Sequence, residues 1–250
     1  MNKETWTAFR KIIKLYHSLI DKTNASLPGL SGQIQHLVDS REGPSYTVDT
    51  PVVYNTALDD ITVESSIKMI LVGDNPGRRE QETCRYLVGP SGKIAERFFL
   101  NNPSLGIDFR KNVLILNKTP IHTPRTAELK TLCTQGGKQL EEAVHYSQKA
   151  MAALLYEFWE IFSREASPPI MVWIIGYSEM KKGGIFEVYT ETLKTLCKTN
   201  PLFKESNFLY RHFSMNQFTI DLKKQALNSE GVSESLKRIG KAYRERVLGQ

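Results

Sequence analysis

Four short apolar runs divide the chain, and longer segments with helical periodicity separate them. The runs cover residues 67–72, 113–116, 170–175 and 208–210. Continuous runs of Val, Ile and Leu are typical of parallel strands that are buried on both faces. Parallel strands need crossover connections, and the intervening segments are long enough to supply them as helices. We therefore expect an α/β fold, specifically a three-layer α/β/α sandwich around a short four-stranded parallel sheet.

Helical periodicity is clearest near the N-terminus and between the apolar runs. Residues 5–21 place apolar side chains on one helical face and Lys and Arg on the other. This basic face is either the solvated side of a packing helix or a surface that faces nucleic acid. Further helices are expected at about 93–102, 137–165, 186–198, 216–226 and 232–247. Residues 24–66 are rich in Gly, Pro, Ser, Thr and Asp, which predicts a long loop with short pieces of structure.

The composition is that of a globular protein with one core. The chain has 250 residues, 40% of them hydrophobic, and we expect a single domain over 1–250 with a helical and loop extension at 1–65. The net charge of +6 favours a polyanionic partner. The three cysteines form no C-x-x-C pair, so we expect neither a zinc site nor a disulfide framework. No apolar run reaches membrane-spanning length and no signal segment follows Met1, which predicts a cytoplasmic monomer without a membrane partner.

The most informative stretch is residues 70–92. The first apolar run stops at the turn 73–77, whose sequence is Gly-Asp-Asn-Pro-Gly. Ligands of open α/β sheets bind at the carboxyl ends of the strands, so the polar side chains of this turn are candidates for a site. A second turn at 89–92, Gly-Pro-Ser-Gly, opens a helical pattern, and its Pro is well placed because a first-turn N–H has no helical partner.

This stretch resembles the first motif of the uracil-DNA glycosylase superfamily. The thermophile-type (family 4) pattern, G-E-x-P-G-x-x-E-D-x-x-G-x-P-F-V-G-x-x-G, lies on residues 73–92 without a gap. The core Gly-Asp-Asn-Pro-Gly is also close to the G-x-N-P-G of the mismatch-specific and single-strand-selective branches. The matching residues are Gly73, Pro76, Gly77, Glu80, Val88, Gly89 and Gly92. The departures are Asp74 for Glu, Gln81 for Asp, Cys84 for Gly, Tyr86 for Pro and Leu87 for Phe.

Two further strand ends resemble elements of the same superfamily. The second apolar run is followed by Asn117, in the place where the glycosylases deliver an Asn that reads uracil. Without that context, Asn117 would be an Asx turn that ends a strand. The fourth run leads into His212 and Ser214, which match the H-P-S-P motif, while Phe213 and Met215 replace both of its prolines.

The resemblance implies a monofunctional DNA glycosylase that flips uracil or a related damaged base out of DNA and hydrolyses its N-glycosidic bond. His212 would donate a hydrogen bond to uracil O2, and Asn117 would read O4 and N3. Gly73 would line the base site. Asn75 occupies the water-positioning place of the Asn-type branches and Asp74 that of the family 4 Glu, and the sequence leaves the choice between them open.

Contacts to the flipped base and to DNA follow from the same resemblance. The family stacks a Phe on the base where this chain has Leu87, so either Tyr86 takes over the stacking, or the base packs on an aliphatic surface, or Tyr86 is a core aromatic. Met215 would be the apolar wedge that fills the vacated stack. Phosphates would be held by Ser91 and Lys93 at a helix N-terminus and by Arg211 and Ser214.

We expect no cofactor, because three cysteines are too few for the iron–sulfur cluster that family 4 carries. Two alternatives remain open. Beside the uracil-DNA glycosylase, the chain could be a glycosylase-fold DNA-binding protein with weak or no activity, or a glycosylase for a different modified base. A nucleoside-triphosphatase is excluded, because Lys93 is followed by Ile94 and the P-loop pattern needs Ser or Thr there.

Overall fold

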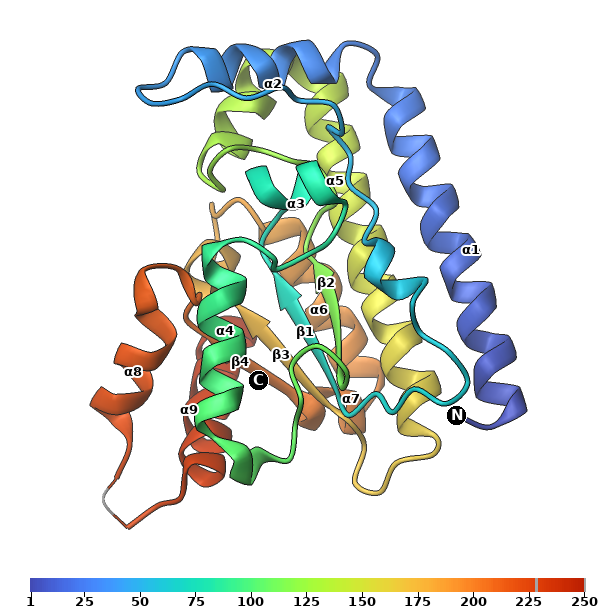
Figure 1. Cartoon of the computed structure of the whole chain (residues 1–250), viewed down its shortest axis with the longest axis vertical. Coiled ribbons are helices and arrows are strands. Elements are labelled where there is room, and N and C mark those ends of the chain that lie inside the picture. Colours follow the sequence, from blue (N-terminus) through green and yellow to red (C-terminus); the bar gives the residue numbers. More distant parts are fainter. Residues whose placement is uncertain (228, 250) are drawn as a thin grey trace.

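A short, fully parallel sheet forms the centre of the protein (Figure 1). The computed structural model describes residues 1–227 and 229–249. The strands are β1 Met69–Gly73, β2 Val113–Asn117, β3 Met171–Ile175 and β4 Asn207–Tyr210, and they lie in the order β2-β1-β3-β4. The four strands coincide with the predicted apolar runs and pair in parallel, which confirms the α/β class and the four-stranded parallel sheet.

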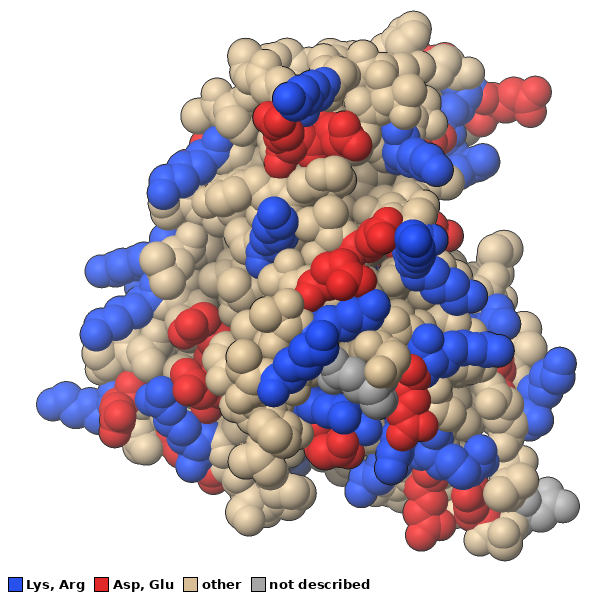
Figure 2. Space-filling view, turned by 180° about the vertical axis from the view of Figure 1, so that it is seen from behind, with Lys and Arg blue, Asp and Glu red and all other residues tan. Residues whose placement is uncertain are grey.

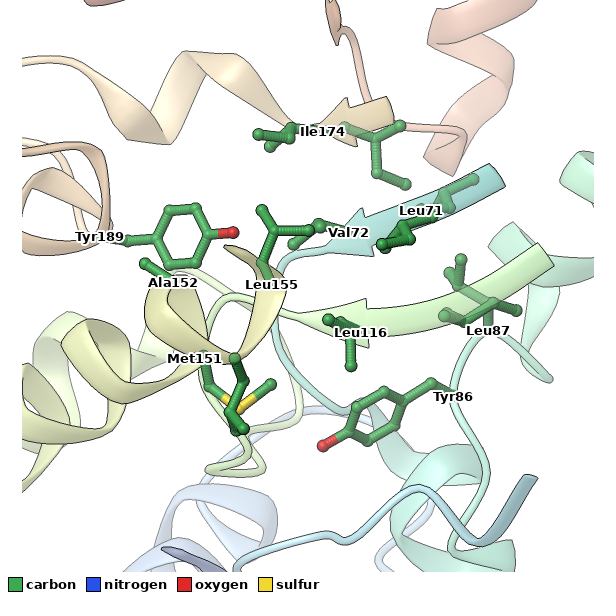
Figure 3. Close-up of a cluster of buried hydrophobic side chains, with 14 of the residues drawn as sticks. Leu71, Val72, Tyr86, Leu87, Leu116, Met151, Ala152, Leu155, Ile174 and Tyr189 are labelled. Atoms are coloured by element: carbon green, nitrogen blue, oxygen red, sulfur yellow. The ribbon is translucent and has the colours of Figure 1, made fainter. Parts of the chain in front are cut away.

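The helices pack on both faces of this sheet. Successive strand residues point to opposite faces, so Trp173 of β3 contacts Phe99 and Phe218 of one helical layer. Ile174 lies on the other face, in the cluster that contains Leu155 and Tyr189 of the second layer (Figure 3). The helices are α1 Lys3–Ser26, α2 Leu30–Asp39, α3 Arg78–Thr83, α4 Pro90–Asn101, α5 Glu128–Ser163, α6 Glu187–Thr199, α7 Pro201–Ser206, α8 Gln217–Gln225 and α9 Val232–Leu248.

Three helical segments were not expected from the sequence. The predicted loop 24–66 contains α2, whose buried residues Leu30, Ile34, Leu37 and Val38 follow helical spacing and pack against α5. The surrounding glycines hide this short pattern. The helices α3 and α7 have only six residues each, which is too short for a periodic signal.

The long helix α5 begins earlier than the sequence pattern indicates. We expected a helix from 137, whereas the helical segment starts at Glu128. Gly137 has φ 74° and ψ −172° inside it, so the chain is kinked there and the two parts have different faces. The periodicity therefore identifies only the part after the kink.

The N-terminal extension packs into the same body as the sheet. On α1, Phe9 lies 5.9 Å from the ring of Phe158 of α5. Further along, Val52 pairs with Ile121 in an antiparallel bridge, and Val53 N–H donates to the Pro120 carbonyl at 2.8 Å. The extension therefore holds the loop that follows β2. Within the described residues, none of the helices is both long and apolar enough to span a bilayer.

Candidate functional site at the carboxyl edge of the sheet

The carboxyl ends of the parallel strands bring most of the candidate residues to one edge. Gly73 is paired with Asn117, and Ile175 with Tyr210, so the segments after all four strands emerge on the same side. The chain moves from β1 to β2 and then returns to the other side of β1 to form β3. The edge between β1 and β3 is thus the topological switch point, where open α/β sheets bind ligands.

Asn75 is fixed by its amide nitrogen. Its Nδ2 donates to the Ile121 carbonyl at 3.1 Å and to Thr123 Oγ1 at 2.8 Å. The first partner is only an acceptor, which defines the orientation of the amide. Both N–H groups are used, so Oδ1 is the atom that remains for a ligand or a water molecule.

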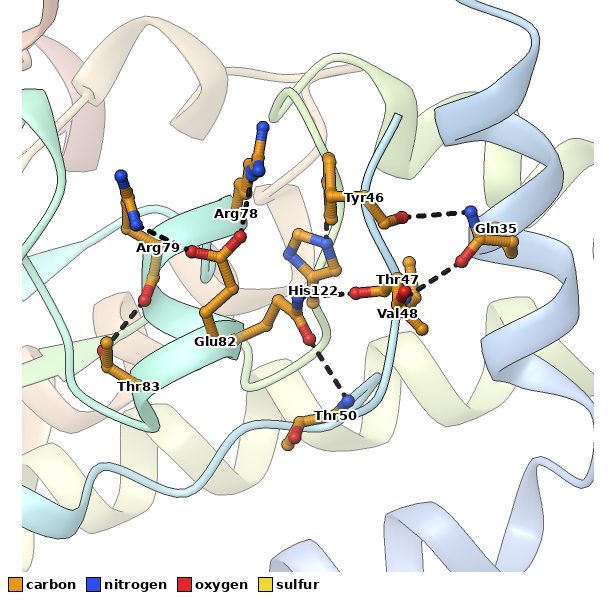
Figure 4. A network of polar contacts seen from close by, with 11 residues as sticks. Gln35, Tyr46, Thr47, Val48, Thr50, Arg78, Arg79, Glu82, Thr83 and His122 are labelled. Atoms are coloured by element: carbon orange, nitrogen blue, oxygen red, sulfur yellow. Dashed lines mark hydrogen bonds and ion pairs between the residues drawn. The ribbon is translucent and has the colours of Figure 1, made fainter. Parts of the chain in front are cut away.

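His122 holds the turn that carries Asn75 through a hydrogen bond to the backbone of Pro76. The buried imidazole donates from Nδ1 to the Pro76 carbonyl at 2.8 Å, and its Nε2 accepts from the Tyr46 hydroxyl at 3.1 Å (Figure 4). Burial lowers the pKa of His122 to about 4, so the ring is neutral at physiological pH. The donor at Nδ1 and the acceptor at Nε2 are those of a neutral ring.

Asn117 places a buried donor without a well-formed hydrogen bond at the same edge. The residue is 2% exposed, and its Nδ2 makes no hydrogen bond of normal geometry, although it lies close enough to the Glu80 carboxylate to lower the pKa of that group. A Cβ on Gly73 would lie 2.5 Å from Asn117 Oδ1, so only glycine leaves room for this side chain. An unpaired buried donor costs about 1–3 kcal/mol, and a ligand that accepts from it removes that cost.

Glu80 of α3 connects two backbone segments beside this site. Its carboxylate accepts from the backbone N–H groups of Gly77 at 3.0 Å and Leu87 at 2.7 Å. Burial raises the pKa of Glu80 to about 7, and the backbone N–H groups of Gly77 and Leu87, followed by the Asn117 side chain, oppose that shift. Glu80 therefore ties together the Gly77 turn and the segment before α4.

The hydrogen bonds of His212 define its tautomer. The backbone N–H of Ser214 donates to Nδ1 at 3.1 Å, and Ser214 Oγ lies 2.9 Å from the same atom. Because Nδ1 accepts, the proton of the neutral ring is on Nε2. Burial lowers the pKa of His212, while Asp74 raises it and Lys118 lowers it further. His212 is therefore a neutral donor that lies within the field of Asp74 and Lys118.

Asp74 is paired with a buried lysine that the sequence did not single out. Lys118 Nζ lies 2.6 Å from Asp74 Oδ1 and donates to the carbonyl of Ile175 at 2.5 Å and of Gly73 at 3.3 Å. Gly176 has φ +80°, and a Cβ there would overlap the Asp74 carboxylate. The pair therefore fills the switch point between β1 and β3.

Tyr86 and Leu87 lie in the core, which favours the core alternative for Tyr86 over stacking on a base. Tyr86 is 1% exposed, donates its hydroxyl proton to the Val53 carbonyl at 2.6 Å and is bonded to the Tyr16 hydroxyl. Leu87 is also buried, with its backbone at φ 50°. Figure 3 shows Tyr86 beside Leu116 of β2. The core alternative for Tyr86 therefore describes its position, because its ring face is covered by protein.

The predicted DNA contacts lie around the edge and are more exposed. Met215 is 78% exposed, and both it and Asn216 have positive φ, a conformation that is rare for residues other than glycine. Lys93 is exposed and Ser91 half-buried in the first turn of α4. Arg211 is exposed, with Nε 3.5 Å from Asp221, and Ser214 is bonded to His212.

Sequence reasoning missed Lys118, His122 and Gly176 as parts of this edge, and it identified Glu80 only as a match to the first motif, without a role. A weak signal exists for the first of these, because a Lys directly after a buried strand must either leave the core or find several acceptors. The sequence alone does not show which strands are neighbours, so it does not show that Lys118 finds several acceptors and stays in the core. On the face drawn in Figure 2, Lys and Arg side chains are spread over the surface with Asp and Glu between them.

A scan against the models of known protein families and a search among curated proteins give no match for this chain. Among the described residues, no three or more His, Cys, Asp and Glu side chains are grouped so that they could hold a metal ion.

Proposed function

We propose that the protein is a monofunctional DNA glycosylase with the fold of the uracil-DNA glycosylases. It removes uracil or a related damaged base after base flipping and leaves an abasic site. The observation that carries this proposal is the buried Nδ2 of Asn117, which makes no hydrogen bond of normal geometry, at the edge that also holds Asn75 and His212. A buried donor without a well-formed hydrogen bond fits an acceptor such as uracil O4.

Each of the other groups has a part in the cleavage of the N-glycosidic bond. That cleavage leaves negative charge on the base and positive character on the sugar, so it needs donors aimed at O2. His212 is neutral with its proton on Nε2, which is the state that can donate there. Asn75 Oδ1 accepts a hydrogen bond from water and orients it towards C1′.

The surroundings of Lys118 support hydrolysis without strand cleavage. A lyase reaction needs an amine that reaches C1′ of the sugar. Lys118 is 0% exposed, and its Nζ donates hydrogen bonds to three protein oxygens. It is therefore not available to form a Schiff base with the sugar.

A panel of oligonucleotides tests this function. Single- and double-stranded substrates with uracil, hypoxanthine or mismatched thymine are incubated with the protein, and abasic sites are detected by alkaline cleavage. We expect uracil to be released without strand breaks before alkali. Asn117→Ala and His212→Ala should each lower the rate by about 10²-fold or more. The exposed His36 of α2 is a matched control, and His36→Ala should retain the full rate.

The burial of Tyr86 and Leu87 favours a second candidate, a DNA-binding protein of this fold with weak or no excision. Base stacking supplies about 1–3 kcal/mol per base, and neither side chain offers a stacking surface. The same panel separates the two candidates. DNA binding without release of any base would support the second and refute the first.

A further inference from the structure

Lys118 is a buried charged side chain at the carboxyl edge of the sheet. The proposed chemistry has no direct use for this side chain. It is 0% exposed, and its Nζ reaches from the end of β2 past β1 to the Ile175 carbonyl at the end of β3. The ring of Phe186 lies 5.0 Å from Nζ. Burying an ammonium group is costly, and a buried ion pair is weak support for stability, so such a pair points to a specific role.

The partner of Lys118 is held in one place from two sides. Asp74 Oδ1 accepts from Nζ at 2.6 Å, and the carboxylate occupies the space that a Cβ on Gly176 would need. The Asp74 backbone carbonyl also accepts from Lys118 N–H at 2.9 Å. Asp74 therefore cannot turn towards a substrate without breaking a charge-assisted hydrogen bond.

Asn75 has the opposite arrangement. Its anchoring contacts use only Nδ2, and they leave Oδ1 as a fixed acceptor. Of the two neighbouring side chains that compete for the water-positioning role, Asp74 is therefore held by Lys118 through Oδ1, whereas the oxygen of Asn75 takes part in none of its anchoring contacts.

We propose that Lys118 is a positioning residue that removes Asp74 from the water-positioning role, assigns that role to Asn75 and keeps Asp74 as a fixed negative charge opposite His212. This inference rests on the proposed glycosylase function. Lys118 touches neither water nor substrate and acts through Asp74. The charged groups that act on His212 are Asp74, from the turn after β1, and Lys118, after β2, while Glu179, after β3, acts on Lys118.

Single-turnover rates on a uracil-containing oligonucleotide test the division of roles. Asn75→Ala should lower the rate by about 10²-fold or more, because the water loses its acceptor. Asp74→Asn retains an oxygen for Lys118 and removes only the charge, so the loss should stay within about tenfold. A loss for Asp74→Asn equal to that for Asn75→Ala would overturn the assignment.

A double variant tests whether Lys118 acts through Asp74. Lys118→Met leaves a buried carboxylate without a partner, whereas Lys118→Met/Asp74→Asn does not. If the two residues act as a unit, the double variant should be no slower than Lys118→Met alone, since the second change removes nothing further. Losses that multiply in the double variant would contradict the proposal.

Arg244 is a matched control for the burial of a cation, because it is 1% exposed and is paired with Glu205 far from this edge. Arg244→Met should leave the rate unchanged.

An NMR titration of the His212 ring gives a readout that does not need activity. Lys118 disfavours the charged ring, so Lys118→Met should raise the pKa of His212. Asp74 favours the charged ring, so Asp74→Asn should lower it further. Asp74→Asn keeps the hydrogen bond to Lys118, so the titration of this variant remains informative if Lys118→Met does not fold. An unchanged His212 titration in Asp74→Asn would refute the proposal.

The two failures are distinguishable. If the wild-type protein releases no base from any oligonucleotide, the proposed function fails, and the His212 titration still decides whether the pair sets the charge at this edge. If uracil is released but the rates of Asp74→Asn and Asn75→Ala coincide, the function stands and the role of Lys118 falls.

Discussion

At the scale of single residues, the absence of a side chain at Gly73 positions the amide of Asn117. The Asn117 oxygen occupies the volume that a Cβ on residue 73 would fill. Glycine is thus required here for close approach, and backbone freedom is not the reason. The donor nitrogen that we assign to the flipped base depends on this contact, because the two residues are opposite each other in the β1–β2 register.

Gly73→Ala should therefore reduce uracil release more than it reduces stability. The added methyl group forces Asn117 to shift, and a displacement of about 1 Å at a reacting centre costs about 10²-fold in rate. Single-turnover rates and thermal unfolding of the same preparation measure the two effects. Gly32→Ala on α2, where a Cβ meets no atom within 4 Å, is the control and should change neither by much. Full activity of Gly73→Ala would remove Asn117 from the base site.

At the scale of elements, the extension completes the site although it lies outside the resemblance to the glycosylases. Tyr46 bonds to His122, which holds the Pro76 carbonyl in the turn beside Asn75. Gln81 of α3 is bonded to the same segment, through the Thr47 carbonyl and Thr50 N–H (Figure 4). The segment 46–54 thus braces both the turn and the loop after β2.

Tyr46→Phe removes one hydroxyl from this brace. We expect a loss of about 1 kcal/mol, seen as a fall in Tm of about 2–4 °C, together with slower uracil release. Tyr156→Phe is the matched control, because its hydroxyl accepts from Asn200 at 3.1 Å away from the edge. It should show a similar fall in Tm with an unchanged rate. Equal rates for the two variants would limit the brace to a role in stability.

The elements that could be predicted from sequence are those whose signal is local. The four strands are uninterrupted apolar runs, so they were identified, and so were the polar residues that follow them. The burial of Lys118 could not be predicted, because it depends on acceptors from β1 and β3 that only the strand order brings together. The core position of Tyr86 depends likewise on Tyr16 of α1, a distant partner.

At the scale of the whole molecule, the net charge favours a polyanionic partner such as the proposed DNA, but it does not locate where that partner binds. The net charge is +6, and on the face shown in Figure 2 both signs are interspersed. Contacts that place the edge on DNA must therefore come from particular residues near it. Lys93, exposed at the start of α4, is one of these candidates.

Salt dependence of DNA binding tests the position of the contacts. Each neutralised phosphate contributes to the slope of log K against log salt, so Lys93→Ala should reduce that slope by about 1. Lys111 is 82% exposed but precedes β2, at the opposite end of the sheet. Lys111→Ala should leave the slope unchanged. Fluorescence anisotropy over a range of salt concentrations measures both, and equal slopes for the two variants would place the DNA elsewhere.

The contact between Tyr46 and His122 also has a consequence for the order of assembly. The two residues are 76 positions apart, and the first leaves the ribosome well before the second. Long-range contacts form late, because the intervening chain must first be ordered. We therefore expect the first two strands and the helices α3 and α4 between them to be in place before the early segment docks. A nascent chain that has not yet released the loop after β2 has an incomplete candidate site, so the proposed activity would be one of the last properties to emerge during synthesis.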